Sequence, residues 1–164
     1  MNTQFIAPAK VKFLLADDVR AETNGKATIV GLFPDDRILV SPLPRGASQP
    51  PGLAAFISQL TAVAILIGGK GQAAALGRVA GPEGQQIYVT ALGQVDLDPA
   101  KSQLVGFKFP GFPVPQFGKY VCTLELGTSK KYDFPFEIHA ANQNGAKIAP
   151  TSNRRPRKTK RRES

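Results

Sequence analysis

The stretch GKYVCTLELGTSKKYDFPFEIHA, residues 118–140, decides the fold of this chain. Over residues 118–126, and again over 132–140, the even positions are apolar or small and the odd positions are mostly polar. A period of two indicates β-strands with one buried and one solvated face. Because Gly127 opens a polar turn between the two segments, the stretch predicts an antiparallel β-hairpin.

Pro135 interrupts the polar face of the second strand. Proline cannot donate a ladder hydrogen bond, so within sheets it is confined to edge strands and bulges. We therefore expect the strand at 132–140 to lie at a sheet edge, with the nitrogen of Pro135 facing outward.

Turn residues divide the rest of the chain into further short segments. The sharpest hairpin signal is Asn24-Gly25, which readily takes the positive φ angles of a tight turn and precedes the β-branched run 28–30. Strands are expected at 10–17, 26–33, 37–40, 61–67, 73–80, 86–92, 103–109, 118–126 and 132–140. Eight or nine short strands at regular spacing predict an all-β protein folded as an antiparallel β-sandwich.

Residues 52–67 leave two structures open. A short helix could form at 53–60, because Pro51 suits a first helical turn, and residues 61–67 would then form a buried strand. A single helix across 52–67 is the alternative, since periodicity cannot separate strand from helix in an apolar run. The fold is therefore expected to contain at most one short helix, near 52–60.

Composition divides the chain into three parts. The expected boundaries are an N-terminal extension at 1–9, a β-sandwich domain at 10–140 and a flexible basic tail at 141–164. The tail begins with Asn, Gln, Gly and Ala and then becomes basic. Such a segment has little apolar surface to offset its ordering entropy, so we expect it to be disordered unless something binds it.

Length and composition bound the class of protein. A chain of 164 residues supports one sizeable core, and its single Cys excludes an intrachain disulfide and a Cys-based zinc site. The first residues lack the basic start and apolar run of a signal peptide. The longest apolar stretch, 53–69, is too short and too polar to span a membrane. We expect a soluble cytoplasmic protein that does not attach to membranes.

Two motifs resemble an uncharacterised family of bacterial and phage-associated proteins. Ala16-Asp-Asp-Val-Arg20, with Gly25-Lys26 and Ile29-Val-Gly-Leu-Phe33 after it, is similar to the N-terminal hairpin of that family. Phe117-Gly-Lys-Tyr-Val-Cys122, through to Phe136-Glu-Ile138, resembles the last hairpin of the same proteins and of immunoglobulin-like sandwiches. The resemblance implies an immunoglobulin-like β-sandwich and implies no activity. The basic tail lies outside it.

No catalytic group of residues can be assembled from the sequence, so we expect neither an enzyme nor a cofactor. The one histidine, His139, falls on the polar face of its strand and is expected at the surface. Cys122 shares a strand face with Tyr120 and Leu124, which is typical of a buried cysteine. Gly68-Gly-Lys-Gly71 lacks the GxxxxGK[ST] spacing of a phosphate loop, and a hairpin turn is expected there.

Three pairs of carboxylates stand near the predicted strand ends: Asp17 with Asp18, Asp35 with Asp36, and Asp96 with Asp98. Acidic loops at one end of a sandwich can bind Ca²⁺ through several oxygens. Aspartate also occurs at strand ends because its side chain accepts hydrogen bonds from nearby backbone amides. Asp17 and Asp18 could equally form a buried ion pair with Arg20. We expect no metal site.

The tail contains seven basic residues in nine positions: Arg154, Arg155, Arg157, Lys158, Lys160, Arg161 and Arg162. Together with Glu163 they carry six of the nine net positive charges of the chain. Such a run binds polyanions by releasing their counterions. Our first hypothesis is a non-enzymatic β-sandwich module whose tail makes sequence-independent contact with nucleic acid. A merely solubilising tail, or contact with another anionic surface, is the alternative.

The second hypothesis is a structural or assembly protein, such as a phage or host accessory component. It would act through sheet edges or through the connection 110–115, PGFPVP, in contact with another protein or a second copy. Phe112 and Val114 would form an exposed apolar contact there if they are not packed.

Overall fold

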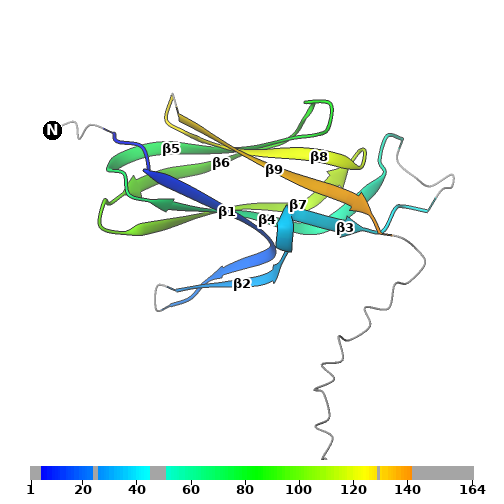
Figure 1. The fold of residues 1–164 in the computed structure, drawn as a ribbon, viewed down its shortest axis with the longest axis horizontal. Coiled ribbons are helices and arrows are strands. Elements are labelled where there is room, and N and C mark those ends of the chain that lie inside the picture. Colours follow the sequence, from blue (N-terminus) through cyan, green and yellow to red (C-terminus); the bar gives the residue numbers. More distant parts are fainter. Residues whose placement is uncertain (1–4, 24–25, 45–50, 129, 142–164) are drawn as a thin grey trace, which may run out of the picture.

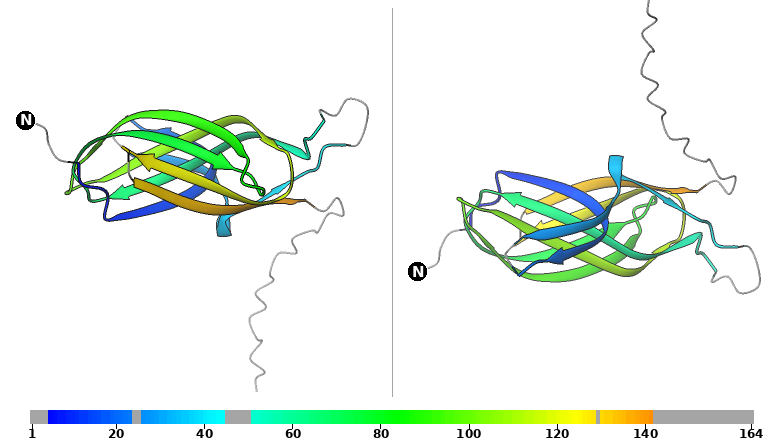
Figure 2. Two further views of the ribbon diagram at one scale, coloured as in Figure 1. Left: turned by 90° about the horizontal axis from the view of Figure 1, so that it is seen from above. Right: turned by 90° about the horizontal axis from the view of Figure 1, so that it is seen from below.

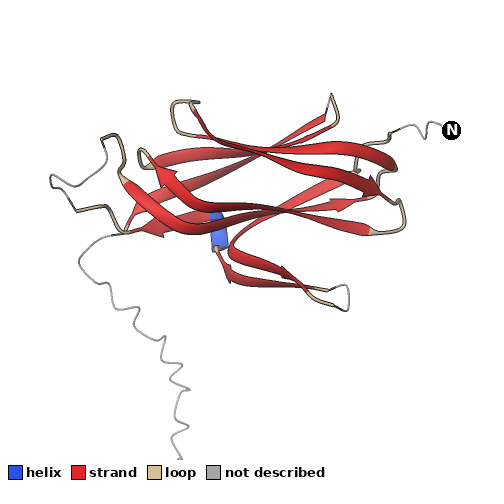
Figure 3. Cartoon of the chain, turned by 180° about the vertical axis from the view of Figure 1, so that it is seen from behind, coloured by secondary structure: helices blue, strands red, loops and turns tan. Residues whose placement is uncertain are grey.

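The computed structural model describes residues 5–23, 26–44, 51–128 and 130–141, and nearly all of its regular structure is β-strand (Figures 1 and 3). The strands are β1 (Lys10–Ala21), β2 (Ala27–Leu32), β3 (Arg37–Val40), β4 (Ala55–Ile67), β5 (Gly71–Ala80), β6 (Gln86–Leu97), β7 (Ser102–Val114), β8 (Gly118–Leu126) and β9 (Lys130–Ala140). One 3₁₀ turn, η1 (Pro34–Asp36), lies between β2 and β3. The prediction of an all-β protein is confirmed.

The strands form two sheets that pack face to face. One sheet has the order β2-β1-β4-β7 and the other the order β3-β9-β8-β5-β6, and β3 with β9 is the one parallel pair among these strands. Views from above and from below show the twisted strands of the two layers crossing, with the end of β3 and the start of β4 opposite to the start of β1 (Figure 2). The predicted antiparallel β-sandwich is confirmed.

The core lies between the two sheets. In β8 the side chains of Tyr120, Cys122, Leu124 and Leu126 are completely buried, as their alternation predicts. They face apolar residues of the other sheet, including Leu60 and Phe107. The Tyr120 hydroxyl donates a 2.6 Å hydrogen bond to the carbonyl of Gln116, the tyrosine-corner arrangement of many β-sandwiches.

No helix forms over residues 52–67, which the expectation of at most one short helix allows. Residues 55–60 are the first half of β4 and pair with β7, so that Ala55 and Ile57 face inward while Phe56 and Ser58 face outward. The predicted strand at 61–67 is confirmed as the second half of the same strand. The apolar run is compatible with a helix or a strand. Its hydrogen bonds to β7, about fifty positions away along the chain, favour the strand.

The connection expected at 110–115 is also wrong, because β7 continues through it to Val114. Pro110 and Pro113 are tolerated there since β7 is the outermost strand of its sheet and needs hydrogen bonds on one side only. Phe112 and Val114 are completely buried. They therefore belong to the core and cannot form the exposed apolar contact considered above.

The prediction for Pro135 holds in part. β9 lies between β3 and β8, but β3 covers only residues 137–140 of it. Pro135 pairs with Val121 of β8 and lies beyond the reach of β3. It therefore stands on a locally open edge, although β9 as a whole is not an edge strand.

The turn at 68–71 is not a hairpin turn. It joins β4 in one sheet to β5 in the other, and Lys70 forms an isolated bridge with Ile6. β5 follows it directly, so no helix stands behind these glycines to hold a phosphate.

Candidate interaction surface at the β1–β2 corner

The candidate surface lies where β1 leaves the sandwich. Residues 10–16 of β1 pair with β4, and residues 16–21 pair with β2. The second half of β1 and all of β2 form a hairpin that projects away from the two packed sheets (Figure 1). Because β1 departs at this point, residues 55–60 of β4 have β7 on one side and no strand of the described ranges on the other.

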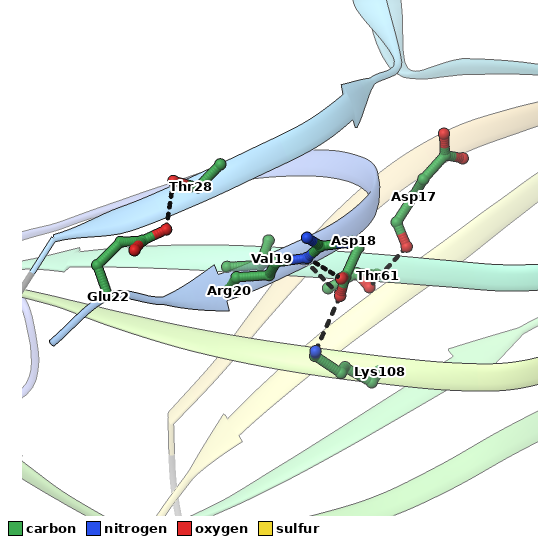
Figure 4. A network of polar contacts seen from close by, with 8 residues as sticks. All are labelled: Asp17, Asp18, Val19, Arg20, Glu22, Thr28, Thr61 and Lys108. Carbon is green, nitrogen blue, oxygen red and sulfur yellow. Dashed lines mark hydrogen bonds and ion pairs between the residues drawn. The ribbon is translucent and has the colours of Figure 1, made fainter.

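A network of polar contacts fixes β1 at this bend (Figure 4). The carboxylate of Asp18 accepts from Lys108 Nζ at 2.8 Å, from Arg20 Nε at 3.1 Å and from the Val19 amide at 2.8 Å. The hydrogen bonds from Lys108 and then Arg20 lower the pKa of Asp18 to about 2. Two cations therefore neutralise Asp18. The buried ion pair considered for this motif is not found, because the Arg20 and Lys108 side chains are 68% and 55% exposed and Asp17 takes no part.

Asp17 points away from this network (Figure 4). Its backbone carbonyl accepts a 3.2 Å hydrogen bond from the hydroxyl of Thr61, which is completely buried. Its carboxylate lies over Gly31, where any Cβ would collide with it and where φ is +64°. Only glycine at position 31 leaves room for the Asp17 carboxylate and takes this φ angle without strain.

Asp35 and Asp36 form the turn η1 next to this bend. Both have positive φ angles, 60° and 50°, a conformation that aspartate tolerates better than most residues. Their side chains are exposed, and neither they nor Asp17 forms an ion pair within the described part of the chain. Asp35 and Asp36 line a shallow pocket together with Arg37 and Lys119, so cations lie near them without forming an ion pair with them.

A shallow groove of about 350 Å³ lies between β3 and the open half of β4. Its floor contains the buried residues Ile38 and Ile57, and Asp17 contributes to its lining. Leu39 and Phe56 line it while remaining 66% and 49% exposed. Among the described strands, β3 and the first half of β4 each lack a neighbour on the side that faces this groove, so exposed apolar side chains lie here beside open backbone edges.

The remaining candidate residues, His139, Cys122 and Asp98, make contacts that account for them without a catalytic or metal-binding role. His139 is at the surface, as predicted, with Nε2 2.7 Å from Glu137. Cys122 is buried, as predicted, and burial, with a smaller effect of Asp133, raises its pKa to about 12. Asp98 accepts from the Ala100 amide and pairs with Lys101, which is the turn role of aspartate. No group of three or more His, Cys, Asp or Glu residues suited to a metal exists among the described residues.

The seven basic residues of the tail lie outside the described residues. The last residue before the undescribed segment, Ala141, donates its amide to the carbonyl of Val40 at 2.8 Å. Ala141, the first residue of the predicted tail, is thus hydrogen-bonded to β3 at Val40, which lines the groove.

Sequence reasoning missed the groove residues Leu39 and Phe56. Both belong to strands whose alternate residues are buried, so local sequence gives no sign that the neighbouring strand diverges.

No helix within the described ranges is long and apolar enough to cross a membrane. No protein-family model matches the chain, and no curated protein sequence matches it significantly.

Proposed function

We propose that the chain is a non-enzymatic binding module in which the β-sandwich carries a basic tail that contacts nucleic acid without sequence preference. The observation that supports this proposal most strongly is the placement of charge. Residues 154–162 hold seven Lys and Arg, whereas the first 153 residues carry only three of the nine net positive charges.

The composition of the tail favours contact with the phosphate backbone over reading of bases. Lys and Arg gain affinity for phosphates by releasing condensed counterions, which needs no defined structure in the tail. Residues 141–164 contain no aromatic side chain on which a base could stack. Binding is therefore expected to depend strongly on salt and weakly on sequence.

The test is fluorescence anisotropy with a labelled oligonucleotide of random sequence. The full-length chain is compared with a chain ending at Pro150 and with a full-length variant in which the seven basic residues are replaced by Gln. We expect at least about a hundredfold weaker binding for both variants, because most phosphate contacts are lost. Equal affinity of the three proteins would refute the proposal.

A second candidate function is assembly with another protein, and the groove between β3 and β4 favours it. Leu39 and Phe56 are exposed there beside two unpaired strand edges, an arrangement that can accept an extended peptide. A Phe56→Ser variant should lose a specific partner, while Leu104→Ser, on an exposed site of β7, should keep it. Retention of every partner by both variants would exclude the groove as the contact.

A further inference from the structure

The outer edge of β2 is an open strand edge on the hairpin that projects from the sandwich. Within the part of the chain that the structure describes, β2 is the last strand of its sheet and pairs only with β1. Five of its six residues are exposed and Ile29 is half-buried, so neither face of the strand is covered by the core. Val30 and Leu32 are 40% and 53% exposed.

The direction of the backbone groups follows from one hydrogen bond. The Glu22 amide donates to the Lys26 carbonyl at 2.8 Å. Hydrogen-bonded pairs alternate along an antiparallel ladder, so Thr28 and Val30 direct their amides toward β1. Ala27 and Ile29 consequently direct their N–H and C=O groups outward, where β2 has no neighbouring strand.

This edge lacks the features that usually prevent strands from pairing with other chains. Its sequence, ATIVGL, contains no charge and no proline, and three consecutive residues are β-branched. By contrast, β7 carries Pro110 and Pro113, and β3 has only four residues. Natural edges are normally blunted by charge, proline or short length, and an unprotected edge pairs readily.

The charges beside β2 indicate which partner fits. Lys26 precedes the strand and is exposed, while Asp35 and Asp36 follow it. When two copies of β2 pair antiparallel about a two-fold axis, the start of each strand lies near the end of the other. Lys26 of each copy then approaches the acidic turn of its partner, so the edge is complementary to itself in charge as well as in hydrogen bonding.

We propose that β2 mediates homodimerisation by antiparallel pairing with β2 of a second copy. The two four-stranded sheets then join into one continuous sheet, with the pair of β2 strands at its centre. This inference does not rest on the nucleic-acid proposal. It adds that each assembly presents two tails, which would strengthen binding to one long polyanion through effective concentration.

The test is sedimentation equilibrium of the full-length chain over about 10 μM to about 1 mM, because the population of a reversible dimer depends on concentration. The mass should rise from 17.5 kDa toward twice that value. Val30→Glu should remain monomeric over this range. The matched control is Val89→Glu, since Val89 is also 40% exposed and lies in the edge strand β6; it should dimerise as the wild type does.

If Val30→Glu fails to fold, a charge-reversal variant at Lys26 tests the dimer instead. Lys26→Glu places like charges opposite Asp35 and Asp36 of the partner and should weaken the dimer about tenfold. Adding Asp35→Asn and Asp36→Asn to the same chain removes that repulsion and should recover most of the affinity.

A wild-type protein that keeps the monomer mass throughout would overturn the proposal. Equal dimerisation of wild type and folded Val30→Glu would also overturn it. A chain ending at Pro150 should dimerise like the full-length protein, so failure of the tail to bind nucleic acid leaves this result unaffected.

Discussion

Lys108 in β7 reaches over β4 to Asp18 in β1, with Lys108 Nζ 2.8 Å from Asp18 Oδ1, although the two residues are 90 positions apart. The bond joins β7 to β1 across β4 on the outer face of one sheet, at the place where β1 turns away from β4. It therefore ties the base of the projecting hairpin to β7.

The low pKa of Asp18, about 2, predicts how stability changes with pH. A carboxylate whose folded pKa is depressed stabilises the fold above its unfolded pKa, and this contribution is lost as pH falls toward the folded value. Wild type should be more stable than Asp18→Asn at pH 6, and the difference should shrink between about pH 4 and pH 2. Urea denaturation midpoints across this range measure it, and a difference independent of pH would contradict the ion-pair assignment.

Removing the Tyr120 hydroxyl should destabilise the sandwich. The hydroxyl donates to the Gln116 carbonyl, and the side chain is completely buried. Tyr120→Phe should lower the free energy of unfolding by about 1 kcal/mol. The control is Tyr132→Phe, because the Tyr132 hydroxyl makes no hydrogen bond within the described residues and its loss should cost less. If the two substitutions lower the free energy of unfolding equally, the hydrogen bond from Tyr120 to Gln116 does not stabilise the sandwich.

Gly77 and Gly106 should respond differently to alanine. A Cβ at Gly77 would collide with the ring of Phe107, whereas one at Gly106 meets no atom within 4 Å. Gly77→Ala should destabilise by about 1–3 kcal/mol through overpacking, and Gly106→Ala should be neutral or slightly stabilising. Thermal denaturation compares them, and adding Phe107→Leu should relieve part of the Gly77→Ala cost. Additive effects of those two changes would show that the contact is not the cause.

Cys122 should be unreactive in the native protein. Thiolate is the reactive form of cysteine, and burial raises the pKa of Cys122 to about 12. Labelling with a thiol reagent at pH 8 should therefore be at least about a thousandfold slower in the folded than in the denatured protein, limited by opening of the sandwich. Rapid stoichiometric labelling of the native chain would show that the β8 face is accessible.

Local sequence was sufficient for the strands that bury every second residue. The strand predicted at 118–126 is confirmed as β8 with the same bounds, because its period-two pattern is strong. Local sequence left helix and strand open over 52–67, because β4 combines an apolar, almost uninterrupted second half with a first half whose structure depends on pairing with β7. Likewise, Pro110 and Pro113 predicted a connection, but an edge strand accommodates them without losing ladder bonds.

The candidate surface was less predictable than the fold. The motif at Asp17, Asp18 and Arg20 lies at the bend of β1, but the main partner of Asp18 is Lys108, which no local pattern connects to it. The groove at Leu39 and Phe56 exists because β1 diverges from β4 after Ala16. Divergence of strands is a property of the assembled sheet, so a single segment of sequence does not encode it visibly.

The most direct test of the proposed function is the salt dependence of oligonucleotide binding by the full-length protein. If the seven basic residues of the tail neutralise phosphates of a single strand, a plot of the logarithm of the association constant against the logarithm of salt concentration should have a slope approaching about −5. The slope and the affinity should be the same for oligonucleotides of unrelated sequence. A slope near zero, or affinity confined to one sequence, would contradict the account.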